Sequence, residues 1–187
     1  MPSEIWLVRH GETEWSRSGQ HTSRTDLPLT SAGQRQAESL KRMLVGHSFA
    51  LVLSSPMTRA VETCRLVGLT PELTDDLREW DYGDYEGLTT AEIQERVPGW
   101  TIFSGAVPNG ETVDQVGARA DRVIAKALAA GGDVALFGHG HLLRILAARW
   151  IGLEPSAGRL LALSTASLSV LGHERETRVI RLWNQTS

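Results

Sequence analysis

The sequence predicts an α/β fold in which helices cover both faces of a mostly parallel sheet. Short continuous apolar runs alternate along the chain with segments whose apolar residues recur every three or four positions, as on one face of a helix. Strands that alternate with helices are joined by right-handed crossovers, which place parallel strands side by side. The length of 187 residues is enough to bury one sizeable core, so we expect a single domain over residues 1–187.

Five apolar runs are the predicted strands. The first three show no polar alternation, which is typical of strands that are buried on both faces. The last two are separated by only a few residues, so we expect a hairpin between them and not a crossover. In chain order the predicted strands are residues 5–8, 50–53, 133–137, 168–171 and 179–183.

Four helices are predicted between these strands. Thr30 is a candidate N-cap for the first, Pro56 stands near the start of the second, and Thr112 with Gln115 forms a capping box before the third. A glycine follows within three residues of each predicted end, as is typical of helix termination. The predicted helices are residues 31–44, 57–67, 113–128 and 141–151.

Two long connections remain, residues 12–28 and residues 80–110. Connections of this length inside a compact domain usually carry functional residues or small helices of their own. We therefore expect part of the functional site in them.

The composition excludes several classes of partner. The 19 Lys and Arg residues nearly balance the 22 Asp and Glu residues, giving a net charge of −3, and nucleic-acid-binding proteins usually carry a basic surface instead. No apolar run approaches the roughly 18 residues of a membrane span. The single Cys64 cannot form an internal disulfide, which is typical of a reducing compartment. We therefore expect a cytoplasmic protein with neither nucleic acid nor membrane as a partner.

Polar residues of one chemical character follow three of the predicted strands. Arg9 and His10 follow the first strand, and His139 follows the third. Arg59 lies after the second strand, in the first turn of the next helix, where the helix dipole favours an anion. Ligands of open α/β sheets bind outside the carboxyl ends of the strands, and arginine presents a planar fork of donors to phosphate oxygens. If these strands are neighbours, the sequence predicts a phosphate site.

The same residues point to a reaction. A neutral imidazole can attack phosphorus to give a phosphohistidine, and nearby cations stabilise the transferring phosphoryl group. The leaving alkoxide then needs a proton from a carboxylic acid. The second long connection supplies four candidates that residue chemistry alone does not separate, namely Glu79, Asp81, Asp84 and Glu86.

A metal site is the alternative interpretation. His139 and His141 form only a weak ligand pair, and arginine beside the candidate histidines disfavours a bound cation. A metal site needs a fuller ligand set than this pair. We therefore expect no metal.

These residues stand in segments that resemble the motifs of the histidine phosphatase superfamily, which includes the cofactor-dependent phosphoglycerate mutases. Residues 7–13, with Arg9 and His10 at their centre, resemble the signature of this family. Four further segments agree in the same order, and the resemblance runs from about residue 5 to residue 149. They are residues 26–30, 54–60, 79–87 and 138–140.

The resemblance implies a fold and a set of roles. The fold would be a phosphoglycerate mutase-like, three-layer α/β/α sandwich, with a mostly parallel sheet and an antiparallel edge strand. His10 would be the phosphorylated nucleophile, and Glu79 stands at the position of the proton donor. Arg9, Arg59 and His139 would complete the phosphate pocket. The family requires no metal, and we expect no cofactor.

The branch that the chain most resembles includes sedoheptulose bisphosphatase and small acid phosphatases. The family often carries Asn at the position of Ser16 and Gln-Gly or Ser-Gly at Thr22 and Ser23, so hydrogen bonds to phosphate from these positions would have altered reach. His21 and His141 would either contact substrate beyond the phosphate or be exposed polar residues. The candidate substrate-binding residues are Ser16, Thr22, Ser23, Gly140 and His141.

Three functions are compatible with these residues. We favour a metal-independent phosphomonoester hydrolase in which His10 attacks, while Glu79 protonates the leaving alcohol and then activates water. The alternative is a cofactor-dependent phosphoglycerate mutase, but true mutases carry a longer insertion with paired arginines and a lysine. Residues 88–110 are short, and Arg96 is their one cation, which favours hydrolysis. A non-catalytic sensor or scaffold is the third, although every residue needed for chemistry is present.

The substrate is expected to be a small phosphorylated metabolite, with sugar phosphates favoured. Trp100, Ile102 and Phe103, together with several hydroxyl groups, are expected to border the pocket. A second phosphate on the substrate would need extra cations. Arg24 in the first long connection is the candidate for this, or is simply solvated.

Overall fold

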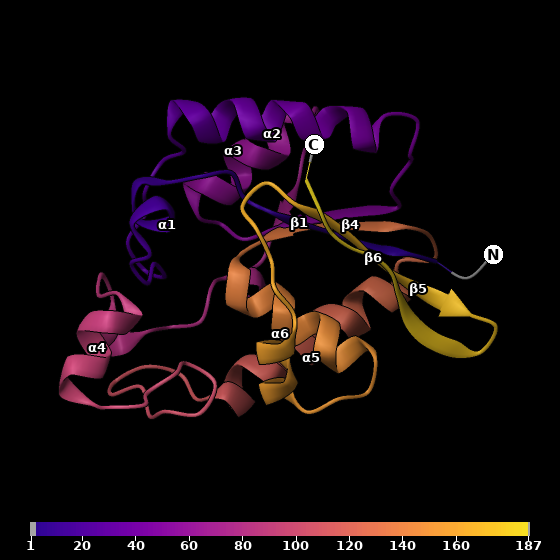
Figure 1. Ribbon diagram of the computed structural model, residues 1–187. Helices are drawn as coiled ribbons and strands as arrows, with labels where there is room; N and C mark the ends of the chain where they lie inside the picture. Colours follow the sequence, from indigo (N-terminus) through magenta and orange to yellow (C-terminus); the bar gives the residue numbers. More distant parts are fainter. Residues whose placement is uncertain (1–2, 187) are drawn as a thin grey trace.

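The sheet has the predicted α/β topology. The computed structural model describes residues 3–186, so Met1, Pro2 and Ser187, the ends of the predicted domain, lie outside the described residues. Within them, six strands form one sheet in the order β3-β2-β4-β1-β5-β6 (Figure 1). The strands are β1 (Ile5–Arg9), β2 (Leu51–Ser54), β3 (Glu72–Leu73), β4 (Val134–Gly138), β5 (Leu168–Glu174) and β6 (Thr177–Gln185).

Strand directions confirm a mostly parallel sheet with an antiparallel edge. β1, β4, β2 and β3 are parallel to one another, whereas β5 runs antiparallel to both β1 and β6. The predicted C-terminal hairpin is present but longer than predicted, because residues 172–174 continue β5 and the turn falls at Arg175 and Glu176. β3 was not predicted, since two residues are too few to show a periodic pattern.

The four predicted helices are present, and the two long connections contain further short ones. Thr30 and Thr112 cap their helices as predicted, accepting from the amides of Gly33 and Gln115. The second helix begins after Met57, so Pro56 lies outside it. The helices are α1 (Glu14–Ser18), α2 (Ser31–Leu44), α3 (Thr58–Leu66), α4 (Thr90–Arg96), α5 (Val113–Ala129) and α6 (Gly140–Trp150), with 3-10 turns η1 (Asp75–Leu77), η2 (Gly83–Tyr85) and η3 (Pro155–Leu160).

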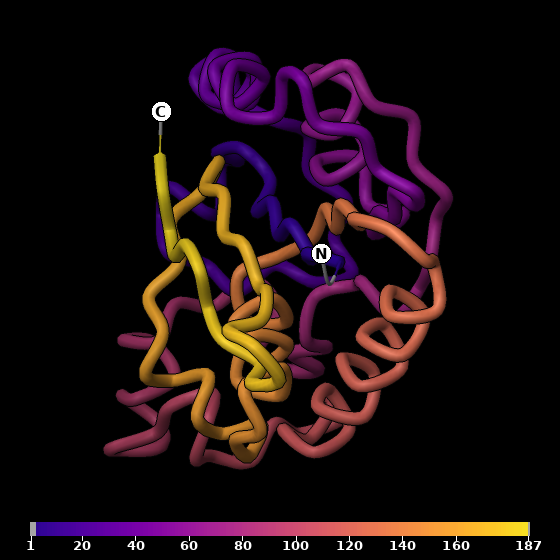
Figure 2. Tube along the Cα trace, turned by 90° about the vertical axis from the view of Figure 1, so that its right-hand side faces the viewer, coloured from indigo at the N-terminus to yellow at the C-terminus, as the bar shows by residue number. Residues whose placement is uncertain are grey.

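Each face of the sheet has its own core, which makes the fold three-layered. Along β1, Ile5 and Leu7 pack into a cluster with residues of α5 and α6, while Trp6 and Val8 pack into a second cluster with residues of α2 and α3. This alternation follows from the two-residue side-chain period of a strand. Figure 1 shows α2 and α3 on one side of the sheet and α5 and α6 on the other, and Figure 2 shows the yellow C-terminal hairpin on the side of the molecule opposite α5.

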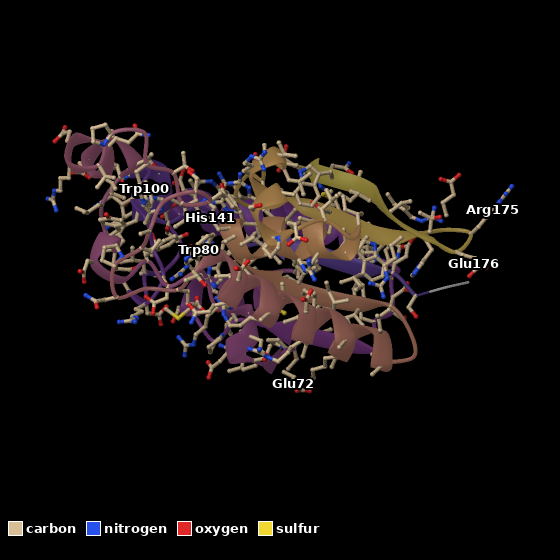
Figure 3. All side chains as sticks on the ribbon, turned by 90° about the horizontal axis from the view of Figure 1, so that it is seen from below. Glu72, Trp80, Trp100, His141, Arg175 and Glu176 are labelled. Atoms are coloured by element: carbon tan, nitrogen blue, oxygen red, sulfur yellow. The ribbon has the colours of Figure 1, made fainter. Side chains whose placement is uncertain are left out.

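The parallel strands place their carboxyl ends at one end of the molecule, beside the two long connections. Figure 3 shows Trp80 and His141 at this end, far from Arg175 and Glu176 at the tip of the hairpin. Within the part of the chain that the structure describes, every helix is too short or too polar to cross a membrane.

Candidate active site

The ends of β1, β4 and β2 meet as the sequence predicts. β4 lies between the other two strands, and the amides of His10 and Ser55 donate to the carbonyls of Gly138 and Phe137, at 3.1 and 2.9 Å. The rings of His10 and His139 stand edge to face with their centroids 5.1 Å apart. The imidazoles at the ends of two neighbouring strands are therefore in contact.

His10 is fixed in the tautomer of a nucleophile. Its Nδ1 lies 2.7 Å from the carbonyl oxygen of Gly11, and because a carbonyl can only accept, Nδ1 carries the proton. Nε2 keeps its lone pair, and the side chain lines a cavity of about 670 Å³. Burial, with Arg59 and Arg9 nearby, lowers the pKa of His10 well below its usual value. The ring is therefore neutral, the form that attacks phosphorus.

Gly11 after β1 is required by a close approach of two backbones. A Cβ on this residue would stand 2.4 Å from the carbonyl oxygen of Gly33 at the start of α2. Its amide donates to the hydroxyl of Thr63 on α3, at 3.1 Å. The loop that carries His10 is thus held against two helices.

Arg59 and His139 are buried and are hydrogen-bonded to each other. Arg59 donates through Nη1 to the carbonyl of Thr25 at 3.1 Å and through Nη2 to the carbonyls of Thr22 and Ser23, both at 3.3 Å. Its Nε donates to Nδ1 of His139 at 3.3 Å. Neither Arg59 nor His139 is a lining residue of the cavity. In this structure the arginine fixes the loop of residues 22–25 and the ring beside His10.

The tautomer of His139 follows from the same contacts. Because Nδ1 accepts from Arg59, Nε2 carries the proton and donates to Oγ of Ser55, 2.8 Å away. Burial and the neighbouring Arg59 lower the pKa of His139 well below its usual value, so this ring is neutral too.

Arg9 is a cation that lines the cavity. Its Nη1 donates to the carbonyl of Leu163, and its Nε is buried without a hydrogen-bond partner among residues 3–186. A Cβ on Gly140 would stand 3.2 Å from the guanidinium carbon, so the glycine makes room for this side chain. A buried donor without a partner costs about 1–3 kcal/mol, which an anionic ligand would relieve.

Glu79 is a carboxylate that lines the same cavity as His10. Its Oε1 accepts from the amides of Trp80 and Leu142, both at 2.9 Å, and its Oε2 accepts from the amide of His141 at 3.0 Å. Two of these amides belong to the first turn of α6, where the helix dipole favours a negative charge. Among the described residues, Glu79 is the one carboxylate that lines the cavity.

The other three candidates for the proton donor are bound to other residues of the protein. Asp81 pairs with Arg24, and Asp84 accepts from the side chain of Asn109. Glu86 accepts from the backbone amides of two residues in the first long connection. None of them lines the cavity, so the structure separates Glu79 from its rivals.

Most of the predicted substrate-binding residues surround the cavity, but Ser23 does not. Ser16, Thr22, Gly140 and His141 are lining residues. Ser23 instead lines a separate cavity, because its amide is bound by Glu86 and its hydroxyl turns towards the carbonyl of Glu79. The carbonyl oxygen of Ser23 accepts a hydrogen bond from Nη2 of Arg59.

His21 and His141 both line the cavity, beside Tyr82. The Tyr82 hydroxyl lies 2.6 Å from Nδ1 of His141, and burial raises the pKa of Tyr82 well above its usual value. The phenol therefore keeps its proton and donates to Nδ1, which leaves an N–H on Nε2 of His141. Burial also lowers the pKa of His141 well below its usual value, and His21 packs on the Tyr82 ring with centroids 4.6 Å apart.

One expectation about the outer pocket is wrong, and of the two alternatives for Arg24 the structure shows the exposed side chain outside this cavity. Trp100 does not line the cavity with Ile102 and Phe103, because it is buried and packs edge-on against His21, 5.7 Å between centroids. Arg24 lines the second cavity, where its guanidinium is paired with Asp81.

Among the cavity residues that the sequence did not predict are Tyr82, Arg144 and Arg159. A signal for Arg144 was available, since it stands three residues after His141 in a helix and such positions share a face. Arg159 comes from η3, a turn with no periodic pattern.

Metal ligation finds no support in the side-chain contacts. His139 is bound to Arg59 and Ser55, whereas His141 is bound to Tyr82, so the two rings have different partners. Within residues 3–186, no group of three or more His, Cys, Asp or Glu side chains could hold a metal ion.

Comparison with known proteins finds similar phosphatases. An acid phosphatase of Mycobacterium tuberculosis is 42% identical over 97% of this chain and 92% of its own length. The sedoheptulose 1,7-bisphosphatase of Saccharomyces cerevisiae is 40% identical over 79% of this chain and 67% of its own length. The solved structure of an open reading frame from Mycobacterium tuberculosis superposes with a TM-score of 0.95 at 39% identity, covering 100% of this chain and 99% of that chain.

The family assignment now has three independent supports, namely the strand-end arginines and histidines, the fold and these relatives. The predicted phosphatase class is supported by the names of two relatives, acid phosphatase and sedoheptulose 1,7-bisphosphatase. The sequence profile of the histidine phosphatase superfamily (branch 1) matches residues 5–186. The chain belongs to the histidine phosphatase superfamily.

Proposed function

We propose that the chain hydrolyses phosphate monoesters of small metabolites through a phosphohistidine on His10, without a metal. The observation that carries this proposal is the neutral His10 with an unprotonated Nε2, in one cavity with Arg9 and Glu79. Phosphoryl transfer needs a nucleophile, charge stabilisation on the phosphoryl oxygens and a proton for the leaving group. These three side chains supply one each.

In the first step, Nε2 of His10 attacks phosphorus as the bond to the ester oxygen breaks. Arg9 stabilises the charge on the phosphoryl oxygens, and protonated Glu79 gives its proton to the leaving alkoxide. Arg59 and His139 are positioning residues in this scheme, because they hold the loop and the ring that surround His10.

In the second step, water attacks the phosphohistidine. Glu79, now a carboxylate, takes the proton of the water as the N–P bond breaks, and His10 returns to its neutral form with inorganic phosphate released. The three amides that bind Glu79 hold its carboxylate oxygens in place for this step.

Hydrolysis is favoured over phosphoglycerate mutase activity by the second long connection. Its one cation between residues 88 and 110, Arg96, ends the short helix α4, is exposed and does not line the cavity. From this segment the cavity receives Thr90, Thr101, Ile102 and Phe103, which do not supply the paired cations that a mutase would place there.

Sugar phosphates are the proposed substrate class. The wall beyond the phosphate carries many hydrogen-bonding groups, including Thr22, His21 and the Nε2–H of His141, which match the hydroxyls of a polyol. The names of two relatives, acid phosphatase and sedoheptulose 1,7-bisphosphatase, support this class. We further propose one domain over residues 1–187 and a cytoplasmic location, which the free, buried Cys64 supports.

The test is release of inorganic phosphate in EDTA from 3-phosphoglycerate, fructose and sedoheptulose bisphosphates and an aryl phosphate. We expect release by the natural protein and a loss of at least about a thousandfold in His10→Ala. His47→Ala is the matched control, because His47 is exposed and outside the cavity. Release that survives His10→Ala would contradict the mechanism, and interconversion of phosphoglycerates without release would favour the mutase.

A further inference from the structure

We propose that the ion pair of Arg119 and Glu111 positions Glu79 for both steps of the reaction. Arg119 lies on α5 and Glu111 just before that helix, and neither residue lines the catalytic cavity. The pair binds residues 76–81, here called the Glu79 loop. This inference rests on the proposed role of Glu79 as acid and base, and it adds two positioning residues to that mechanism.

The Glu79 loop has little regular structure of its own. It begins in the 3-10 turn η1 and ends before η2, and residues 78–82 belong to no helix or strand. A general acid must hold its oxygen within hydrogen-bond reach of the leaving group, and a displacement of about 1 Å can cost about a hundredfold in rate. Contacts from other parts of the chain must therefore fix the backbone that carries Glu79.

Arg119 supplies such contacts with its whole guanidinium. Nη1 donates to the carbonyls of Asp76 and Arg78, at 3.0 and 2.9 Å, and Nη2 donates to the carbonyl of Glu79 at 3.3 Å. Nε and Nη2 also donate to the two carboxylate oxygens of Glu111, each at 2.7 Å. All five N–H groups of the arginine are thus engaged, three of them by carbonyls of the Glu79 loop. These contacts favour a role within the protein over a role in ligand binding.

Glu111 binds the far end of the same loop. Its amide donates to the carbonyl of Asp81, and its Oε2 accepts from the amide of Asp81, both at 3.0 Å. Its carbonyl accepts from the indole of Trp80 at 2.8 Å. The side chains of Arg119 and Glu111 are only 12% and 23% exposed, so water screens this two-bonded pair little. The pair therefore binds the loop from one end to the other.

The carboxylate of Glu79 depends on the loop through its neighbour. Oε1 accepts from the amide of Trp80, the next residue of the loop, while the other two amides that bind the carboxylate come from α6. Glu79 is therefore held twice, at its backbone carbonyl by Arg119 and at its carboxylate by α6. A shift of the loop would carry the backbone of Glu79 and the amide of Trp80 with it, and would move the carboxylate relative to the cavity.

A double-mutant cycle between Arg119 and Glu79 tests this role. The natural protein, Arg119→Gln, Glu79→Gln and the double variant are assayed with an alkyl phosphate, because both steps of its hydrolysis need Glu79. The ester is whichever of 3-phosphoglycerate, fructose 1,6-bisphosphate and sedoheptulose 1,7-bisphosphate the natural protein hydrolyses fastest.

We expect the effect of Arg119→Gln to vanish when Glu79 is absent. In the natural protein it should lower kcat about tenfold or more, with less than a twofold change in KM. In Glu79→Gln the same substitution should lower kcat less than twofold, because there is no acid left to position. A residue that only stabilises the fold would lower kcat by the same factor in both proteins.

The leaving group provides a second readout. A nitrophenolate leaves without a proton, so the rate of the first step with nitrophenyl phosphate should change less than twofold in Arg119→Gln. Arg119→Lys keeps the charge but loses the planar fork that reaches three carbonyls, so it should hydrolyse the alkyl phosphate as slowly as Arg119→Gln.

Arg149→Gln is the matched control. Arg149 on α6 donates through Nε and Nη2 to the two oxygens of Asp121 on α5, at 2.9 and 3.1 Å, so this variant also removes an ion pair with two hydrogen bonds. Neither residue lines the cavity. We expect kcat with the alkyl phosphate to stay within twofold of that of the natural protein.

Several results would overturn the proposal. They are full activity of Arg119→Gln, an equal loss in both backgrounds, recovery in Arg119→Lys, or a comparable loss in Arg149→Gln. If Arg119→Gln does not fold, Glu111→Gln replaces it in the cycle, since it has the same shape and keeps the backbone bonds of Glu111 to Trp80 and Asp81. An unchanged kcat in Glu111→Gln would then overturn the proposal.

The same assays separate this inference from the proposed function. Undiminished hydrolysis by Glu79→Gln, or no hydrolysis of any of the three esters by the natural protein, would defeat the proposed mechanism and the positioning role with it. A large loss in Glu79→Gln together with an equal effect of Arg119→Gln in both backgrounds would leave the mechanism standing and defeat the positioning role alone.

Discussion

Replacing Glu79 with glutamine should separate the two steps of the reaction. The carboxylate now accepts three backbone N–H groups, two on Oε1 and one on Oε2. A glutamine side chain keeps one acceptor oxygen and places an NH₂ group where the other oxygen stood. At least one of the three backbone N–H groups then points at this NH₂ donor and loses its acceptor. The loss of one charge-assisted bond lowers the free energy of unfolding by about 1.5–3 kcal/mol, a change that a 187-residue protein can tolerate.

The effect on rate depends on the leaving group. An alkoxide needs a proton as it departs, and a general acid contributes about a hundred- to ten-thousandfold to such a step. A nitrophenolate leaves without a proton, so the first step on an aryl phosphate survives in Glu79→Gln. The second step needs Glu79 as the base for water with either substrate, so the phosphohistidine accumulates.

The assay is rapid mixing of Glu79→Gln with excess nitrophenyl phosphate. We expect a burst of nitrophenolate equal to the enzyme concentration, followed by turnover reduced by about a hundredfold or more. With a sugar phosphate the same variant should give no burst. Asp84→Asn is the matched control, since Asp84 is exposed and outside the cavity, and it should behave as the natural protein does.

Two results would refute this reasoning. Equal loss of the first step with aryl and sugar phosphates would show that Glu79 does not act through the leaving group. Full steady-state activity of Glu79→Gln would show that another group supplies and removes the proton.

The remaining predictions concern the buried histidines and their partners. Burial lowers the pKa values of His10, His139 and His141 well below the usual 6.5. Above pH 6.5 these rings are therefore neutral in both the folded and the unfolded protein, and below pH 6.5 only the unfolded chain takes up protons on them. The free energy of unfolding should therefore fall by up to about 4 kcal/mol per pH unit as the pH drops below 6.5, and urea unfolding at a series of pH values would show a flat profile if the rings were protonated when folded. Tyr82→Phe removes the donor to Nδ1 of His141 and should raise KM for sugar phosphates about tenfold while KM for an aryl phosphate changes little; equal changes in both would contradict the tautomer. Arg59→Lys cannot serve three carbonyls and an imidazole together, so kcat/KM should fall by about a hundredfold or more, and an unchanged value would contradict its positioning role.

The fold was largely predictable because its main elements carry strong patterns. The buried runs of β1, β2 and β4 and the caps at Thr30 and Thr112 are local signals, and the structure confirms them. The short helices α1 and α4 were not predicted. Each is at most two turns long, and helices of that length are stabilised by tertiary packing more than by their own sequence.

The site residues that follow strand ends were predictable from the sequence. Those on the two long connections were less predictable, because the loop conformation sets which side chains face the cavity. His10 and His139 meet because β1 and β4 are neighbours in the sheet, an arrangement that the sequence pattern left open and the structure shows. The positions of Ser23, Arg24 and Trp100 depend on which side of a long connection faces the cavity. That choice is made by distant contacts, such as the bonds from Glu86 to the loop of Ser23, and no local pattern encodes them.

Two residues of the cavity wall were also unpredictable from local sequence patterns. Arg144 packs on the ring of Phe103, and Tyr82 is hydrogen-bonded to His141; in each pair the partner is distant in sequence. Their side chains alone suggest a solvated helix face and a loop aromatic. Only the packing of the second long connection against α6 gives them a place in the site.

Trapping the covalent intermediate tests the central claim most directly. Glu79→Gln is mixed with nitrophenyl phosphate, quenched under conditions that preserve phosphohistidine, and digested for mass spectrometry. We predict one phosphoryl group on the peptide that contains His10, in an amount equal to the burst, and none in Glu79→Gln combined with His10→Ala. A burst without a phosphoryl group on His10, or a phosphoryl group on another residue, would contradict the account.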